Sequence, residues 1–179
     1  MPESRPHLSD DVVDFSTGHI DFAALESFRF AEGGGYPPSY RDFIRRYGWA
    51  RTFGLWLIYP PVFPGYADGR GRAEVLNERF RDRYRDGRAE EFEWMIEPDG
   101  DWARVEALHV FGWSENGDAL LWDTSARRAD GEFPVWESRG LDSLHLLGPT
   151  LSDALSAIRD TRSGSESRAD IEPLPPVRL

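Results

Sequence analysis

The alternation of apolar and polar positions is clearest between His109 and Thr124, where two aromatic-rich runs flank Asn116-Gly117. Asn-Gly between apolar runs is typical of a two-residue hairpin turn, because both turn positions need a positive φ. Counting outward from this turn predicts which residues face each other. One face would pair Trp113 with Leu120, Phe111 with Trp122 and His109 with Thr124, and the other Gly112 with Leu121 and Val110 with Asp123. Because both faces carry apolar residues, we expect a central hairpin that is covered at least partly on both sides.

The tip of this hairpin contains a conflict. The two-residue turn would place Glu115 directly opposite Asp118, and like charges across a strand pair repel. Either the loop is longer than two residues, or the acidic tip serves a purpose other than stability.

Apolar residues three and four positions apart predict helices near both ends of the chain and one helix in the middle. Asp21 is a predicted N-cap with Ile20 packed on Leu25, and Gly33-Gly34-Gly35 is expected to end that helix. A second helix is predicted between Pro38 and Gly48, with the apolar stripe Tyr40, Phe43, Ile44 and Tyr47. Residues 72–86 form a third, with Leu76, Phe80 and Tyr84 every four residues. The last begins at Thr150, with Asp153 at N3 and the buried stripe Leu151, Ala154, Leu155 and Ile158.

Further strands are expected at 53–59, which Pro60-Pro61 ends, and at 133–136, where Pro134 indicates a late start or an edge position. Together these elements predict an α+β fold. It would be a mostly antiparallel, twisted sheet of roughly five or six strands with helices packed at both chain ends. Residues 1–18 would be an N-terminal arm, 19–160 a single globular domain, and 161–179 a tail rich in proline and serine. The tail's PxxPxR pattern, Pro173 to Arg178, could dock on an aromatic groove, although a tail lying loosely on its own domain is favoured.

The composition narrows the possible chemistry. The chain of 179 residues has no cysteine, and all 21 basic residues are arginine, which excludes thiolate metal sites and lysine-dependent catalysis. The net charge of −11 disfavours nucleic acid as a partner and favours basic partners, or simply keeps the protein soluble. A signal peptide and a transmembrane helix are not expected, so we predict a cytoplasmic protein without membrane contact.

Charge is distributed in two blocks. The predicted helix 72–86 is rich in arginine, which could contact RNA or phosphate, but the interleaved Glu74, Glu78, Asp82 and Asp86 favour pairing within the helix. An acidic segment follows, in which carboxylates alternate with tryptophans. It contains Glu90, Glu91, Glu93, Trp94, Glu97, Asp99, Asp101 and Trp102. Such a segment suits recognition of a basic partner, with charge for steering and aromatic rings for anchoring, or it is an acidic turn beside a solvated loop. We predict these eight residues, together with Glu115 and Asp118, as partner-binding residues.

The candidates for catalysis and metal binding are weak. The four histidines, His7, His19, His109 and His145, lack metal-binding spacing, and Asp99-Gly100-Asp101 lacks the other ligands of a calcium loop. His109 or His145 near Asp123 with a serine would resemble a hydrolase site, but the residues around Ser114 lack the second glycine of a nucleophile elbow. We expect neither an enzyme nor a metal or cofactor.

Four segments resemble, in order, the motifs of the SUKH superfamily. They are 38–48 for the amino-terminal helix, 109–124 for the central strands, 131–135 for the last strand and 151–155 for the closing helix. The resemblance spans about 20 to 160. It implies a binding fold without catalytic residues, and many bacterial members are immunity proteins that neutralise a toxin. The expected function is therefore an immunity protein for a basic toxin domain, possibly a nuclease, that is monomeric when free. The alternative is a scaffold or regulatory interaction domain with no toxin partner.

Overall fold

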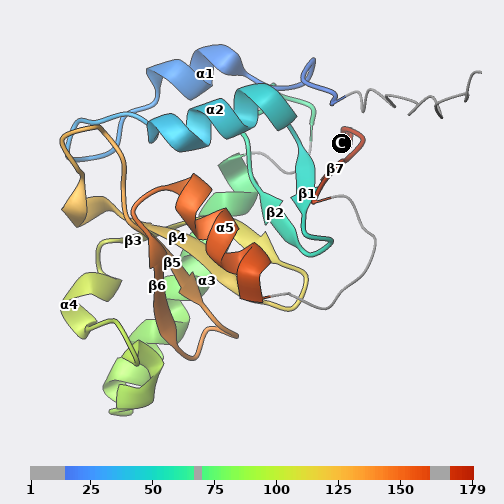
Figure 1. Ribbon diagram of the computed structural model, residues 1–179. Helices are drawn as coiled ribbons and strands as arrows, with labels where there is room; N and C mark the ends of the chain where they lie inside the picture. Colours follow the sequence, from blue (N-terminus) through green and yellow to red (C-terminus); the bar gives the residue numbers. More distant parts are fainter. Residues whose placement is uncertain (1–14, 67–69, 162–169) are drawn as a thin grey trace, which may run out of the picture.

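The computed structural model describes residues 15–66, 70–161 and 170–179, and in this part of the chain seven strands form one antiparallel sheet (Figure 1). The strands are β1 (Ala50–Thr52), β2 (Trp56–Ile58), β3 (Leu108–Ser114), β4 (Ala119–Asp123), β5 (Val135–Ser138), β6 (Leu144–Gly148) and β7 (Ile171–Pro173). The helices are α1 (Phe22–Ser27), α2 (Pro38–Tyr47), α3 (Arg70–Ala89), α4 (Trp102–Val105) and α5 (Leu151–Thr161), with 3₁₀ turns η1 (Glu93–Ile96) and η2 (Thr124–Ala126). The spatial order is β6-β5-β4-β3-β2-β1-β7. The predicted α+β class is confirmed.

Helices cover both faces of the sheet. The helices from the two ends of the chain, α1, α2 and α5, lie on one face, and α3 lies on the other (Figure 1). The first face forms a core with Trp122 and Phe111, and the second a core with Leu121 and Val110. The expectation that the central hairpin is covered on both sides is therefore confirmed.

The register predicted for this hairpin is wrong. The structure pairs Trp113 with Ala119 and His109 with Trp122. The loop contains three residues, because the backbone N–H of Ser114 donates to the carbonyl of Asp118 at 2.8 Å. Gly117 has a φ of +91° and follows a turn closed by its own N–H on the Ser114 carbonyl. The charge conflict at the tip is thus resolved by a longer loop.

A bulge in β3 decides which side chains reach which core. The register shifts between Val110 and Gly112, so that Phe111 is the extra residue of β3. Val110 and Phe111 still point to opposite cores, but Trp113 packs with Val110 on the α3 face instead of with Phe111. The expected placement of Trp113 beside Phe111 was wrong for this reason.

The predicted strand 53–59 is also only partly correct. Phe53 and Gly54 have φ values of +51° and +68° and form the turn between β1 and β2, so the strand itself begins at Trp56. The N–H of Leu55 donates to the carbonyl of Thr52 at 3.1 Å across this turn, and Thr52 pairs with Trp56, so three residues separate the two strands. Phe53 is a bulky residue in a conformation that favours glycine.

Part of the predicted tail joins the sheet. β7 pairs with β1, with Arg51 opposite Glu172, and the N–H of Leu174 donates to the carbonyl of Trp49. The end of the chain continues along the loop after β2, where Leu179 donates to Gly65. With β1, β6 and β7 included, the sheet has seven strands, which is more than the roughly five or six expected.

The helix starts follow the local sequence, whereas one helix end does not. Asp21 caps α1 by accepting from Ala24 N at 2.8 Å, Pro38 is the first residue of α2, and Thr150 accepts from Asp153 N at 3.1 Å, all as predicted. However, α1 ends at Ser27 and not at the glycines 33–35. A side chain on Gly34 would collide with the guanidinium of Arg127 at 2.3 Å, so this glycine makes room for an arginine from a distant segment.

An asparagine of α3 takes the place of a strand beside β3. β2 pairs only with residues 112–114 of β3, so Val110 has no strand partner on that side. The side chain of Asn77 accepts from Val110 N at 2.7 Å and donates to Val110 O at 3.1 Å. This amide fixes α3 on the sheet, and it makes Asn77 a buried polar residue within an otherwise apolar stripe.

Candidate functional site

The acidic segment begins where α3 ends. The N–H of Phe92 donates to Gly87 O at 2.9 Å and the N–H of Glu91 to Arg88 O at 3.2 Å, which is the Schellman pattern of a helix end. Glu91 occupies the left-handed position of this motif, with a φ of +59°, where glycine is preferred. The turn therefore projects consecutive carboxylates from the end of α3 at a conformational cost.

Packing below this turn places one tryptophan at the surface. Met95 is completely buried against Gly87, where a Cβ would lie 2.1 Å from the Met95 sulfur. Trp94, its neighbour in η1, points outward and is 50% exposed. Phe92 stacks against the indole of Trp94 with ring centroids 4.5 Å apart.

The turn between β5 and β6 holds Trp94 in place. The indole N–H of Trp94 donates to Asp142 at 3.3 Å, and Arg83 of α3 contacts the same carboxylate oxygen at 3.3 Å. On the adjoining edge strand, the side chain of Leu146 is also 50% exposed. Trp94 is thus half-exposed and is held in place by Phe92 and Asp142.

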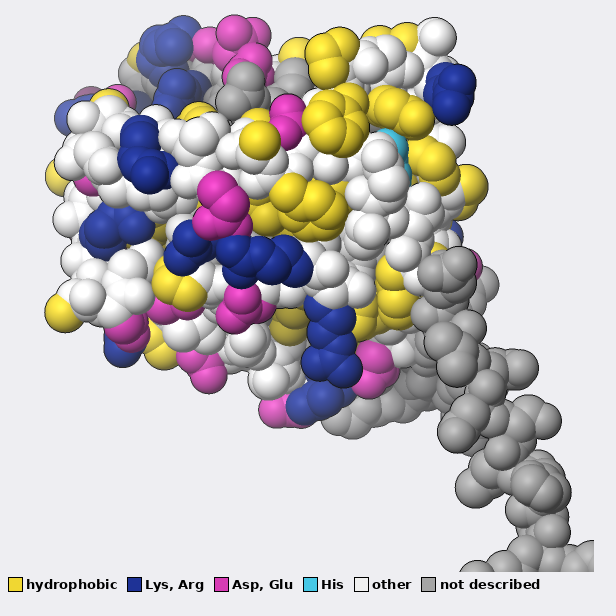
Figure 2. Space-filling model, turned by 90° about the horizontal axis from the view of Figure 1, so that it is seen from above, with side chains coloured by type: hydrophobic (Ala, Val, Ile, Leu, Met, Phe, Trp, Pro, Cys, Tyr) yellow, Lys and Arg dark blue, Asp and Glu magenta, His cyan; other side chains and the backbone are white. Residues whose placement is uncertain are grey.

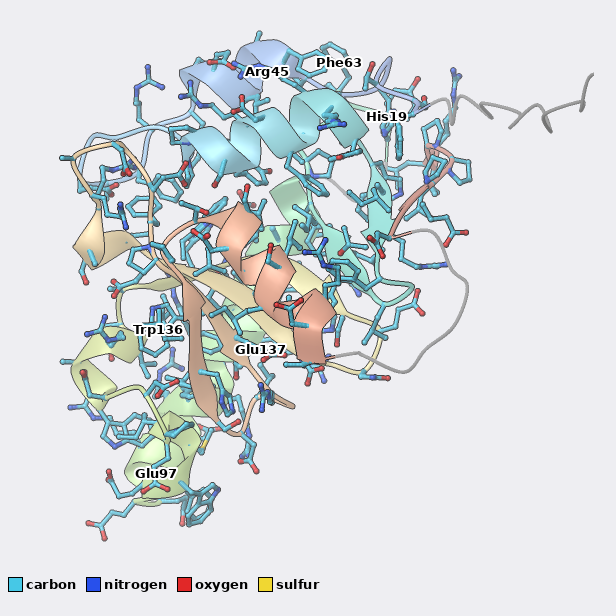
Figure 3. All side chains as sticks on the ribbon, viewed as in Figure 1. His19, Arg45, Phe63, Glu97, Trp136 and Glu137 are labelled. Atoms are coloured by element: carbon cyan, nitrogen blue, oxygen red, sulfur yellow. The ribbon has the colours of Figure 1, made fainter. Side chains whose placement is uncertain are left out.

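Unlike Asp142, which pairs with Arg83, the glutamates near Trp94 in the chain have no ion-pair partner among the described residues. Among the residues that the structure describes, Glu90, Glu91, Glu93 and Glu97 form no ion pair. These four residues and Trp94 are called the Trp94 surface below. It lies at the end of the molecule opposite α1 and α2, as the position of Glu97 relative to His19 and Phe63 shows (Figure 3). The face of α1 and α2 carries both signs of charge, where Glu26 pairs with Arg41 and Arg45 (Figure 2).

Three of the predicted residues mainly hold the structure together. Asp99 accepts from the N–H of Leu146 at 2.9 Å, so its carboxylate occupies part of the open edge of β6. Asp101 caps α4 by accepting from Arg104 N at 2.7 Å. Trp102 donates its indole N–H to Glu93 at 3.0 Å and is partly buried.

The two residues predicted at the hairpin tip, Glu115 and Asp118, contact other segments of the chain. Glu115 pairs with Arg51 of β1 at 2.8 Å. Asp118 accepts from Ser114 Oγ at 3.0 Å and from Gly140 N at 2.8 Å, which fixes the loop between β5 and β6. Both carboxylates of the acidic tip therefore have contacts within the chain, to Arg51 and to Ser114 and Gly140.

The arginines of α3 pair partly as predicted. Arg85 pairs within the helix with Asp82 at 2.8 Å. Arg83 and Arg88 instead reach outside it, to Asp142 and Glu106. Arg83 therefore supports Trp94 through Asp142, a role that its place in the sequence does not indicate.

The residues considered for hydrolysis have other neighbours. Asp123 is fully buried and contacts the guanidinium of Arg104 and, at 2.6 Å, the hydroxyl of Ser125. His109 lies parallel to the ring of Trp122, and His145 lies 3.0 Å from Ser143 Oγ.

The burial of His109 predicts a pH dependence. Burial, with a smaller contribution from Arg81, lowers the pKa of His109 from 6.5 to about 4. Between these two values the unfolded chain binds a proton that the folded chain does not, so acid destabilises the fold in this window. We expect His109→Phe to reduce the loss of unfolding free energy between pH 7 and pH 4 by up to about 3 kcal/mol, as measured by urea denaturation. Equal losses in the two proteins would contradict a neutral His109.

No group of His, Cys, Asp or Glu side chains in the described ranges could hold a metal ion, and no helix there is long and apolar enough to cross a membrane. No protein-family model matches the chain, and comparisons with curated proteins and with solved structures give no significant match. The resemblance to the SUKH superfamily therefore rests on the four sequence segments alone.

Proposed function

We propose that this protein is an immunity protein that binds a basic toxin domain through the Trp94 surface and blocks it in the cytoplasm. The observation that carries the proposal is the half-exposed Trp94, held by Phe92 and Asp142 among carboxylates without ion pairs. A few residues provide most of the binding energy in protein interfaces, and tryptophan is enriched among them. Surrounding charge accelerates association with an oppositely charged partner. The motif resemblance to SUKH proteins supports the same class of function.

The backbone of Glu91 adds to this argument. A non-glycine residue in the left-handed region costs roughly 1–2 kcal/mol relative to glycine. A glutamate at this position adds a carboxylate to the Trp94 surface at the expense of stability, as is common at binding sites.

The first experiment is co-expression with the product of the neighbouring gene, measuring rescue of growth and co-purification. Rescue together with co-purification supports the immunity function. Co-purification with a cellular protein and no effect on toxicity would instead support the scaffold or regulatory alternative.

The surface itself is tested by removing its charge. Changing Glu90, Glu91, Glu93 and Glu97 to Gln should slow association with the partner about tenfold and weaken its dependence on salt, while the melting temperature stays nearly unchanged. Association is measured by surface plasmon resonance at several salt concentrations. Exposed charges act mainly on the association rate, so dissociation should change less.

The matched control neutralises four carboxylates elsewhere, Glu26, Glu32, Asp42 and Glu172, each of which faces an arginine. Both variants change the net charge equally, so only the position of the charges differs. We expect the control to associate at close to the wild-type rate. Equal slowing in both variants would mean that overall charge, and not the Trp94 surface, attracts the partner.

A further inference from the structure

A pocket opens beside the end of α5, on the face of the sheet that α5 covers. It has a volume of about 310 Å³. Its apolar walls come from three parts of the chain: Leu55 and Trp56 where β2 begins, Leu147 of β6, and Ala157 and Ile158 in the last turns of α5. Such walls suit an apolar chain, which would lose its contact with water on entering the pocket.

Glu137 of β5 brings a carboxylate to this pocket (Figure 3). The residue is 8% exposed, and its backbone pairs with Leu120 and His145 within the sheet. Its Oε2 accepts a hydrogen bond from Arg139 Nε at 2.9 Å. Its Oε1 accepts no hydrogen bond from the described residues, and unlike Trp122 Nε1 it is not sealed from solvent. One oxygen of a largely buried carboxylate is therefore free and can be reached from the pocket.

The charges around the pocket favour a cation. Asp118 adds a second carboxylate to the lining, and the last turn of α5 adds the negative end of a helix dipole. Of the described side chains that line the pocket, only Arg139 is positively charged, and it is already paired with Glu137. The excess of negative charge attracts a cation and repels an anion.

The single free oxygen selects among cations. A guanidinium binds a carboxylate best through both oxygens at once, but Arg139 already occupies Oε2 of Glu137. An ammonium group is a compact charge that can donate one hydrogen bond to Oε1 and its other two to water. The pocket therefore fits a primary ammonium better than a guanidinium.

We propose that this pocket binds a small primary amine with an apolar chain. The ammonium group donates to Glu137 Oε1, and the chain packs against the apolar walls. The pocket shares no residue with the Trp94 surface, so the proposal does not depend on the immunity function and its test requires no protein partner.

The test compares hexylamine with hexanol, two chains of the same length that differ in charge. Both are titrated into the full-length protein at about pH 7, where a primary amine is protonated, and dissociation constants are measured by ligand-observed NMR. Glu137→Gln keeps the shape of the side chain and removes its charge. It should weaken the binding of hexylamine about tenfold and that of hexanol less than about twofold. Equal weakening of both compounds, or no saturable binding of hexylamine to the wild type, would overturn the proposal.

Two further variants locate the binding site. Glu132→Gln makes the same change in another buried carboxylate, which binds Ser39 and does not line the pocket, so the affinity for hexylamine should stay unchanged. Ala157→Trp keeps Glu137 and extends a large side chain from the pocket wall, so it should weaken both compounds at least about tenfold. Equal effects of Glu132→Gln and Glu137→Gln, or undiminished binding to Ala157→Trp, would contradict the assignment.

Discussion

Trp122→Ala should lower the free energy of unfolding by about 3–5 kcal/mol, as measured by urea denaturation. Trp122 is 1% exposed and contacts rings from three different parts of the chain: Phe111 of β3, Tyr40 of α2, and Phe30 after α1. Its removal would leave a large cavity, because the surrounding aromatic rings are rigid and cannot move far enough to fill it. The hairpin would lose the contact between Trp122 and Tyr40 of α2.

The control is Trp94→Ala, which removes the same side chain from a half-exposed position. Because Trp94 buries only about half of its area, against Phe92 and beside Asp142, we expect a smaller loss, of about 2 kcal/mol. A wild-type melting temperature for Trp122→Ala would show that the hairpin is not the centre of this fold.

Arg104→Met should cost about 3–5 kcal/mol, because it leaves a buried charge without its partner. The carboxylate of Asp123 is fully buried, and the guanidinium of Arg104 contacts it from α4. The same guanidinium lies 4.9 Å from the ring centre of Trp136, so the arginine also connects α4 to β5. The loss is measured by urea denaturation at pH 7.

Changing both residues separates the charge from the packing. Arg104→Met combined with Asp123→Asn removes the unpaired charge while keeping the contacts with Ser125. The double variant should therefore be more stable than Arg104→Met alone. A double variant that is as unstable as the single one would show that the cost comes from lost packing on Trp136.

Elements whose signals lie within a few residues were predictable. The caps at Asp21 and Thr150 and the first residue of α2 at Pro38 follow from contacts over three or four positions, as do the stripes of α2 and α5. The position of the central hairpin was predictable for the same reason. Its exact register was not, because a three-residue loop and a bulge at Phe111 each shift the pairing by one residue.

In the acidic segment, too, the sequence predicts only what depends on neighbouring residues. The sequence shows its charge and its tryptophans, but not which of them are free to bind. Contacts with distant residues decide that Asp99 protects the edge of β6, and that Glu115 pairs with Arg51. Trp94 remains exposed because Met95 takes the buried position beside Gly87.

The sequence by itself determined the α+β class, the starts of α1, α2 and α5, and the location of the acidic segment, because these depend on periodicity, capping and charge along the chain. The tertiary structure decided the joining of β7 to β1, the use of Asn77 in place of a strand, and the pairing of Arg104 with Asp123. Each of these contacts joins residues that are far apart in the chain and have no shared local pattern. Their partners become defined only when the sheet and its two helical layers are assembled.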